Sequence, residues 1–244
     1  MNKKILTITL ILIFSFSIPN NSDTHYYIEK TNKQFNLVKD YKVDMVIKLD
    51  IPGFRMPRKK YKVYYMNPNM IKVESRGFGI LPKTGIFTSP SDNFDNLKNI
   101  SLSSYSDPLN INDILIVGEL IVDSLKLDMP NEYSRLTFKP TVEVRIDTLN
   151  WVIKNVTTKL DTLKLFQINN TYLAYDNQFY MPSESVVKYY VKDEKLFNWI
   201  NKDAGSIIND GSAMATNTSI VEGTIKVNYE NYIINKGLDK KLFD

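Results

Sequence analysis

Asp40–Pro82, DYKVDMVIKLDIPGFRMPRKKYKVYYMNPNMIKVESRGFGILP, is the stretch that decides the fold. It holds three runs in which apolar and charged residues alternate, separated by Pro52-Gly53 and by Asn67-Pro68-Asn69. Such alternation predicts strands with one buried and one solvated face, and the Pro, Gly and Asn residues predict the breaks between them. Because these strands carry no set of reactive side chains, their long apolar face indicates a protein that holds apolar ligands.

The segment before these strands predicts a helix. Asp23 or Thr24 can cap its start, and its apolar side is marked by residues at helical spacing, namely Tyr27, Thr31, Phe35 and Val38. Beyond the strands, Phe94, Leu97 and Ile100 have the spacing of a helical turn. The apolar run Ile114–Leu127 favours a buried strand with a bulge or bend at Gly118; a buried helix is the alternative.

Strand patterns return from Leu136 to Val191 and again in a closing strand, Val221–Tyr229, before a tail from Asn231 to Asp244. The turns between the strands are predicted at Asp147–Asn150, Asn169-Asn170 and Asp176-Asn177. Short strands joined by brief turns describe an antiparallel meander. The expected fold class is therefore mainly antiparallel β with a few helices.

The N-terminus predicts export. Lys3 and Lys4 precede an apolar and hydroxyl run from Ile5 to Ile18, the layout of a secretory signal peptide over residues 1–22. Cleavage is expected after Ser17, with Ser22 as the alternative site; an uncleaved anchor is disfavoured because the run is shorter than the roughly 20 residues of a membrane span. No cysteine is present for lipidation, so residues 23–244 are expected to form one soluble domain that is exported.

Side chains with catalytic or metal-binding patterns are missing from the sequence. His25 is the single histidine, and the acidic loops Asp92–Asp95 and Asp107–Asp113 do not match calcium-loop spacing. We therefore predict no catalytic residues, no metal and no cofactor. A pair of carboxylates for glycoside hydrolysis stays open, which keeps a secreted hydrolase as a minor alternative.

The charges indicate a solvated surface. The formal net charge is +4, and basic and acidic residues are interspersed, so no nucleic-acid partner is expected. One local excess of basic residues comprises Arg55, Arg58, Lys59 and Lys60. It is either an exposed strand edge protected by charge or a docking patch for an acidic partner or anionic lipid headgroups.

Three segments together resemble the LolA-type carrier and sorting proteins for outer-membrane lipoproteins. They are Asp50–Pro82, Val142–Val156 with its Ile146-Asp147 turn and Trp151, and Ile225–Phe243 with Asn235-Lys236-Gly237-Leu238. The resemblance implies a half-open β-barrel whose concave apolar face is covered by helices. It also implies a monomeric carrier that takes acyl chains across the periplasm and works with an inner-membrane release complex and an outer-membrane receptor. The chain departs from the family in two ways. It has a long polar excursion at Ala204–Ser219, and the arginine that gates the cavity in the family has no clear match, with Arg55, Arg58 and Arg76 as candidates.

An open barrel leaves apolar side chains for a ligand to cover. The expected cavity wall consists of alternating residues of the first strands: Val43, Met45, Ile47, Tyr61, Val63, Tyr65, Ile71 and Val73. The expected cover or rim consists of Phe78, Ile80, Leu81, Ile86 and Phe87. The alternative for each is ordinary core packing under a helix. A lipid or lipoprotein sensor on the same fold is the second functional hypothesis.

Overall fold

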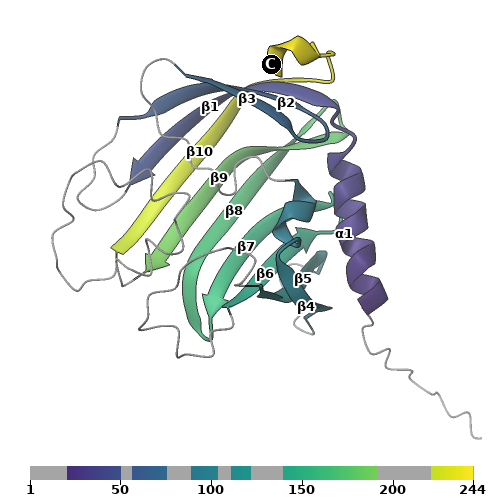
Figure 1. Ribbon diagram of the computed structural model, residues 1–244, viewed down its shortest axis with the longest axis vertical. Helices are drawn as coiled ribbons and strands as arrows, with labels where there is room; N and C mark the ends of the chain where they lie inside the picture. The colour runs from purple at the N-terminus through teal and green to yellow at the C-terminus, as the bar shows by residue number, and fades with distance from the viewer. Residues whose placement is uncertain are drawn as a thin grey trace, which may run out of the picture.

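The computed structural model describes residues 21–50, 57–75, 89–103, 111–121, 140–191 and 221–243. These ranges contain one ten-stranded antiparallel sheet in the order β3-β2-β1-β10-β9-β8-β7-β6-β5-β4 (Figure 1). Its strands are β1 Asp40–Asp50, β2 Lys59–Met66, β3 Met70–Ser75, β4 Leu97–Leu102, β5 Asp113–Leu120, β6 Pro140–Asp147, β7 Val152–Leu160, β8 Leu163–Tyr175, β9 Phe179–Val191 and β10 Val221–Ile234. Since β3 and β4 are edges that do not pair with each other among these strands, the sheet is an open half-barrel, and the predicted fold class is confirmed.

The helix α1, Asn21–Phe35, shows how strongly the sheet is curled (Figure 1). It packs on β4, β7 and β9, and its Phe35 ring lies 5.7 Å from the ring of Tyr65 in β2. In a flat sheet β2 and β4 would be nearly 40 Å apart, whereas a helix of this length spans about 22 Å. The sheet must therefore wrap around the helix, which lies on the same side as the buried strand face.

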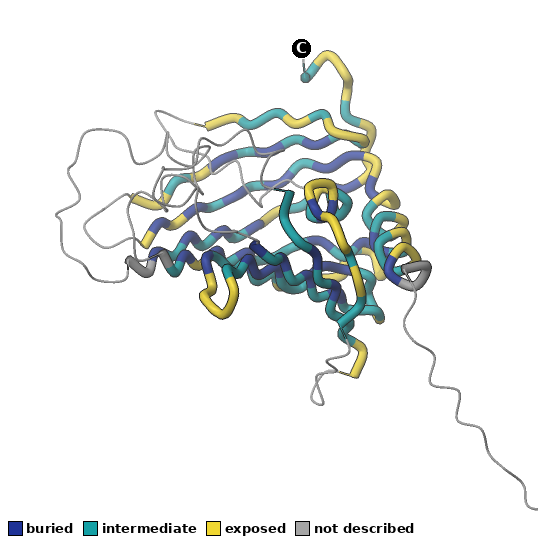
Figure 2. The backbone as a smooth tube through the Cα atoms, turned by 60° about the horizontal axis from the view of Figure 1, so that its bottom comes forward, coloured by how far each residue is buried: buried dark blue, intermediate teal, exposed yellow. Residues whose placement is uncertain are grey.

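One apolar row crosses the buried face of the sheet without a break. Backbone pairing places its members opposite one another on seven successive strands, in the order Leu49, Ile225, Val187, Ile168, Val156, Val144 and Ile116. All seven are buried, and the alternation of buried and exposed positions along the strands is visible in Figure 2. The period-2 pattern of the sequence thus becomes one continuous apolar surface.

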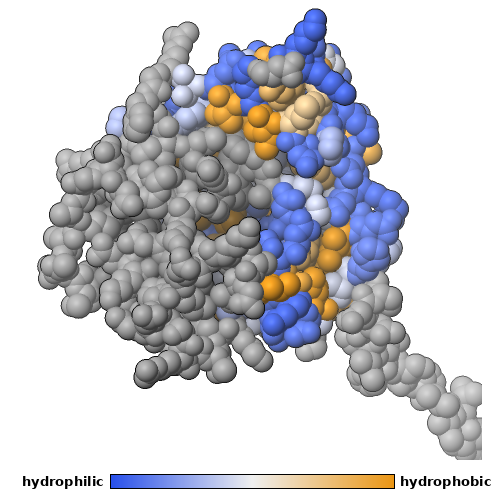
Figure 3. All heavy atoms as spheres, in the orientation of Figure 1, coloured by the Kyte–Doolittle hydropathy of each residue, from blue (hydrophilic) through white to orange (hydrophobic). Residues whose placement is uncertain are grey.

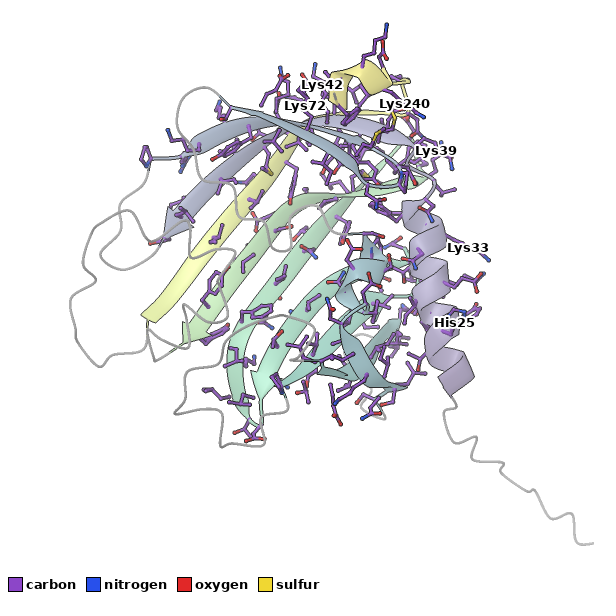
Figure 4. The ribbon with its side chains drawn as sticks, in the orientation of Figure 1. His25, Lys33, Lys39, Lys42, Lys72 and Lys240 are labelled. Atoms are coloured by element: carbon purple, nitrogen blue, oxygen red, sulfur yellow. The ribbon has the colours of Figure 1, made fainter. Side chains whose placement is uncertain are left out.

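The predicted helix is confirmed, with Val38 just beyond its end, but it begins at Asn21, so Asp23 and Thr24 lie inside it and do not cap its start. Thr31 is buried, and its hydroxyl donates to the Tyr27 carbonyl oxygen at 2.8 Å. His25 and Lys33 point away from the sheet (Figure 4), and Lys33 forms an ion pair with Glu29 at 2.7 Å. Among the described residues no helix is long and apolar enough to span a membrane.

The turn predicted at Asn169-Asn170 is wrong, because β8 runs through both residues. The two asparagines find partners in neighbouring strands: Asn155 Nδ2 donates to Asn169 Oδ1 at 2.7 Å, and Ser185 Oγ donates to Asn170 Oδ1 at 2.7 Å. These cross-strand bonds satisfy the side chains that would otherwise favour a turn. The turns predicted at Asp147–Asn150 and Asp176-Asn177 are confirmed.

Two further predictions about the middle of the chain need correction. The helical turn expected at Phe94, Leu97 and Ile100 is instead a 3-10 turn, η1, at Pro90–Asn93, followed by β4. The strand at Ile114 is confirmed. The irregularity expected at Gly118 lies in the facing strand β4, whose register shifts between Lys98 and Ser101 opposite this glycine, whereas the pairing of β5 with β6 is regular through Gly118. Glycine is needed there for close approach, because a Cβ at Gly118 would lie 3.0 Å from Leu97 Cβ.

The closing strand is longer than predicted, because β10 continues to Ile234 and takes in the first residues of the expected tail. The residues that follow β10 are hydrogen-bonded to the start of β1. Asp40 accepts hydrogen bonds from the Lys236 and Gly237 amides at 3.1 Å, and Asn235 Oδ1 accepts one from the Lys39 amide at 2.7 Å. A second 3-10 turn, η3 at Lys240–Phe243, ends on β3, where Lys72 Nζ donates to the Leu242 carbonyl oxygen at 2.6 Å. These bonds hold the C-terminal segment against the start of β1 and against β3.

Candidate ligand-binding site

A cavity of about 110 Å³ lies between α1, η1 and the concave face of the sheet. One wall is formed by the helix, the residue Val38 that follows it, and η1; its residues are Thr31, Gln34, Phe35, Val38, Pro90 and Asn93. The sheet supplies the rest from the residue preceding β7 and from β1 and β7 to β10: Tyr41, Trp151, Val152, Ile153, Val156, Ile168, Asn170, Tyr172, Tyr180, Met181, Pro182, Ser185, Tyr229 and Tyr232. None of these lining residues carries a charge at neutral pH, so the cavity suits an uncharged group.

The polar groups on the sheet side of the cavity are linked by hydrogen bonds. Asn170 accepts from Ser185 Oγ and donates through Nδ2 to the Ile153 carbonyl oxygen at 3.0 Å. The Tyr172 hydroxyl donates to the same carbonyl at 3.0 Å. This network fixes the side chains that face the cavity and leaves aromatic and aliphatic surface between them.

Tyrosines dominate one end of the cavity. The Tyr41 ring stacks on Tyr65 at 5.0 Å and meets the Tyr232 ring edge-on at 5.8 Å. Burial raises the pKa of Tyr229 to about 12, and it raises the pKa of Tyr41, Tyr172 and Tyr232 as well, because a phenolate would lose its hydration there. An environment that disfavours phenolate also disfavours other anions.

The cavity lies beside the wall expected from the sequence. Six of the eight expected wall residues are buried on the concave side of β1 and β2: Val43, Met45, Ile47, Tyr61, Val63 and Tyr65. Backbone pairing puts Ile71 and Val73 on the same face at the edge, where Ile71 is 40% exposed and Val73 half-buried. None of these eight residues lines the described cavity. The residues that do line it share closeness to α1, which depends on the curl of the sheet, and the sequence pattern does not reveal that closeness.

The expected cover residues lie outside the described part of the chain, whereas most of the basic patch lies within it. The described residues do not include the expected cover, the candidate arginines Arg55 and Arg76, the Ala204–Ser219 excursion, or the signal peptide up to residue 20. The expected cover consists of Phe78, Ile80, Leu81, Ile86 and Phe87. Arg58 and Lys60 are exposed, but Lys59 pairs with Ile47 and Lys60 with Val46, so the two lysines face opposite sides of β2. A different group of lysines gathers outside the sheet, near the end of α1 and the C-terminal turn (Figure 4). We call Lys39, Lys42, Lys72 and Lys240 the lysine cluster.

The lysine cluster has no carboxylate partner in the part of the chain that the structure describes. Lys39 Nζ donates to the Asn36 carbonyl oxygen at 2.9 Å, and Lys42 Nζ lies 5.8 Å from the centre of the Tyr64 ring. The outer side of α1 and the C-terminal end are hydrophilic (Figure 3). Within the described ranges no group of three or more His, Cys, Asp or Glu side chains is placed to hold a metal ion.

Comparison with known proteins supports the fold. No protein-family model matches the sequence, and no curated protein does. A DUF1329 family protein from Desulfovibrio piger matches with a TM-score of 0.50 at 8% identity, over 90% of this chain and 96% of that one. A LolA superfamily protein from Nitrosomonas europaea matches with a TM-score of 0.45 at 9% identity, over 93% and 98%. At such identities the likeness is one of fold alone, and the match to the DUF1329 structure carries it.

Proposed function

We propose that this protein is a periplasmic carrier that binds the acyl chains of a lipoprotein or another lipid against the concave face of its half-barrel. The observation that carries this proposal is the unbroken apolar row across seven strands, which leads to an uncharged cavity under α1. A surface of this kind recognises hydrocarbon without needing a catalytic group. The sorting proteins that the sequence resembles are the precedent for such a role.

The size of the cavity bears on how a lipid is held. A cavity of roughly 150 Å³ takes up benzene, so the 110 Å³ found here accommodates one small group and not a whole acyl chain. Each methylene that leaves water contributes about 0.8 kcal/mol, and a long chain needs an extended apolar surface to reach on the order of 10 kcal/mol. We propose that the chain lies along the concave face and that the cavity takes its end.

Access to this face requires a cover that can move, and α1 fits that role. Its N-terminal half meets the sheet through rings: Trp151 lies 5.9 Å from Tyr26 and 6.3 Å from Tyr27. Its C-terminal half forms the cavity wall. Ring contacts of this kind adapt to a shift of the helix more readily than a row of hydrogen bonds would, since few directional bonds need to be exchanged.

The first test is the content of the purified protein. The full chain should be exported in its native host and purified from the periplasm. Extraction and mass spectrometry should then detect bound acyl lipid. The protein should then move a fluorescent acyl lipid from donor vesicles to acceptor vesicles. Protein that is free of lipid after purification and that ignores acylated peptides and lipid probes would refute the carrier function.

A pair of variants locates the binding surface. Val156→Phe adds a ring to the wall of the cavity and should lower lipid binding at least tenfold, because the added atoms fill a large part of the space. Val186→Phe makes the same exchange in β9 at a position that pairs with Lys226 on the opposite face, and it should leave binding unchanged. Circular dichroism must show that both variants fold. Equal binding by the two would place the ligand elsewhere.

A sensor of lipids or mislocalised lipoproteins is the second candidate, and the lysine cluster favours it. Its four cations lie at one end of the half-barrel and have no carboxylate partner among the described residues, so they offer a docking surface for an acidic protein partner. The transfer assay separates the two roles. A carrier delivers lipid to acceptor vesicles, whereas a sensor retains its lipid and is recovered with one membrane protein in fixed stoichiometry.

A further inference from the structure

The hydroxyl group of Tyr41 distinguishes this residue from three other tyrosines of the cavity, Tyr172, Tyr229 and Tyr232. Tyr41 is 8% exposed and lines the cavity, yet in the described part of the chain its hydroxyl has no hydrogen-bond partner. By contrast, the Tyr232 hydroxyl donates to the Pro182 carbonyl oxygen at 2.9 Å, and the Tyr172 hydroxyl donates to the Ile153 carbonyl oxygen. Tyr229 is bonded to Ser185.

The position of Tyr41 is fixed from two sides, so its hydroxyl cannot easily turn to another partner. Its ring is stacked on Tyr65, whose own hydroxyl is held by the Pro68 carbonyl oxygen at 2.9 Å, and it is flanked by the Tyr232 ring. The preceding residue, Asp40, is anchored by the Lys236 and Gly237 amides. A phenol that is held rigidly and lacks a partner is a preformed hydrogen-bond donor for a ligand.

The surroundings of Tyr41 decide which acceptor it can serve. Among the described residues that line the cavity there is no lysine, arginine or histidine to neutralise an anion. Burial also raises the pKa of the neighbouring tyrosines, which is the sign of a site that opposes negative charge. A carboxylate or phosphate would be left unpaired there, whereas a carbonyl oxygen can accept the bond without carrying a charge.

We infer that the cavity binds the uncharged carbonyl of an ester- or amide-linked acyl group, which accepts a hydrogen bond from the Tyr41 hydroxyl. This inference rests on the proposed function and names the part of the ligand that enters. The 110 Å³ accommodate a carbonyl and its adjoining carbons. Tyr41 is then a specificity-determining residue that distinguishes acyl lipids from alkyl ethers and from free fatty-acid anions.

The test compares two probes that differ in the carbonyl alone. Dioleoylglycerol carries two ester carbonyls, and its dialkyl ether analogue, with the same chains, carries none. The affinity of the full chain for each is measured by displacement of a fluorescent fatty alcohol. The wild-type protein should prefer the ester about five- to tenfold, the factor that one buried hydrogen bond contributes, and Tyr41→Phe should abolish the preference.

Tyr232→Phe is the matched control. Tyr232 also lines the cavity, but its hydroxyl is already engaged by Pro182, so this variant should retain the preference for the ester. The infrared band of a carbon-13 ester carbonyl supplies a second readout: it should shift to lower frequency on binding to the wild-type protein and to Tyr232→Phe, and not on binding to Tyr41→Phe.

The outcomes separate the inference from the proposed function. Equal binding of ester and ether by the wild-type protein would overturn the inference while leaving the lipid carrier intact. The same would follow from an ester preference that survives in Tyr41→Phe, or from tighter binding of oleate anion than of the ester. Failure of every probe to bind would overturn the proposed function, and the inference with it.

Discussion

Alkaline pH should unfold this protein through the tyrosines that surround its cavity. Burial raises the pKa of Tyr229 to about 12 and raises the pKa of Tyr41, Tyr172 and Tyr232 above the ordinary value of 10. For such groups the unfolded chain releases its protons at a lower pH than the folded one does. Their stabilising contribution is therefore fully present below about pH 10 and is lost as the pH rises toward the folded-state pKa.

The size of the loss follows from the same linkage. Between about pH 10 and pH 11, each tyrosine that stays protonated in the folded protein lowers the free energy of unfolding by about 1 kcal/mol, so four lower it by about 4 kcal/mol. A typical domain is stable by about 5–15 kcal/mol. The protein should therefore lose a large part of its stability within one pH unit, and it should unfold before its buried phenols ionise in the folded state.

Urea titrations at several pH values between about 8 and 11 measure this loss directly. Tyr229→Phe removes one of the four contributions and should reduce the decrease from about 4 to about 3 kcal/mol. The matched control is Tyr26→Phe, since Tyr26 is 48% exposed and should leave the decrease unchanged. Reversible ionisation of all tyrosines near pH 10 with an intact circular dichroism spectrum would refute the reasoning.

Three further substitutions test the packing that positions the site. Gly118→Val should destabilise the fold by about 1–3 kcal/mol in urea melts, because its side chain would collide with Leu97, and adding Leu97→Ala should recover part of the loss. Asp40→Ala leaves two amides without acceptors, so it should cost about 1–3 kcal/mol and speed hydrogen exchange at the Lys236 and Gly237 amides. Trp151→Ala should loosen α1, which limited proteolysis would detect as faster cleavage within the helix.

The first strands could be predicted because their pattern is local. Met45 and Ile47 alternate with Lys48 and Asp50, and whichever strand pairs with β1, residues two apart must share a face. The helix is equally local, since Tyr27 and Thr31 recur at its period and Thr31 bonds to the Tyr27 carbonyl oxygen. These elements can therefore be predicted without knowing which distant segments pack against them.

The strand through Asn169 and Asn170 could not be predicted in this way. Two adjacent asparagines favour a turn when their side chains bond locally. Here the side chains bond to Asn155, Ile153 and Ser185 in neighbouring strands, and those bonds exist only once the sheet has formed. The cavity was missed for the same reason: Tyr41 and Tyr232 meet because β1 pairs with β10 from the other end of the chain.

The expected wall and the observed cavity combine into one proposed site when the strand direction is considered. Along β1, Tyr41 lies at the cavity and Leu49 at the far end, about 26 Å away for an extended strand. One acyl chain spans about 15 Å, half the hydrocarbon core of a bilayer. A carbonyl bound at Tyr41 would therefore place its chain over Val43 and Met45. Because both side chains are buried, the chain must displace the groups packed on them, and binding has to be coupled to an opening of the half-barrel.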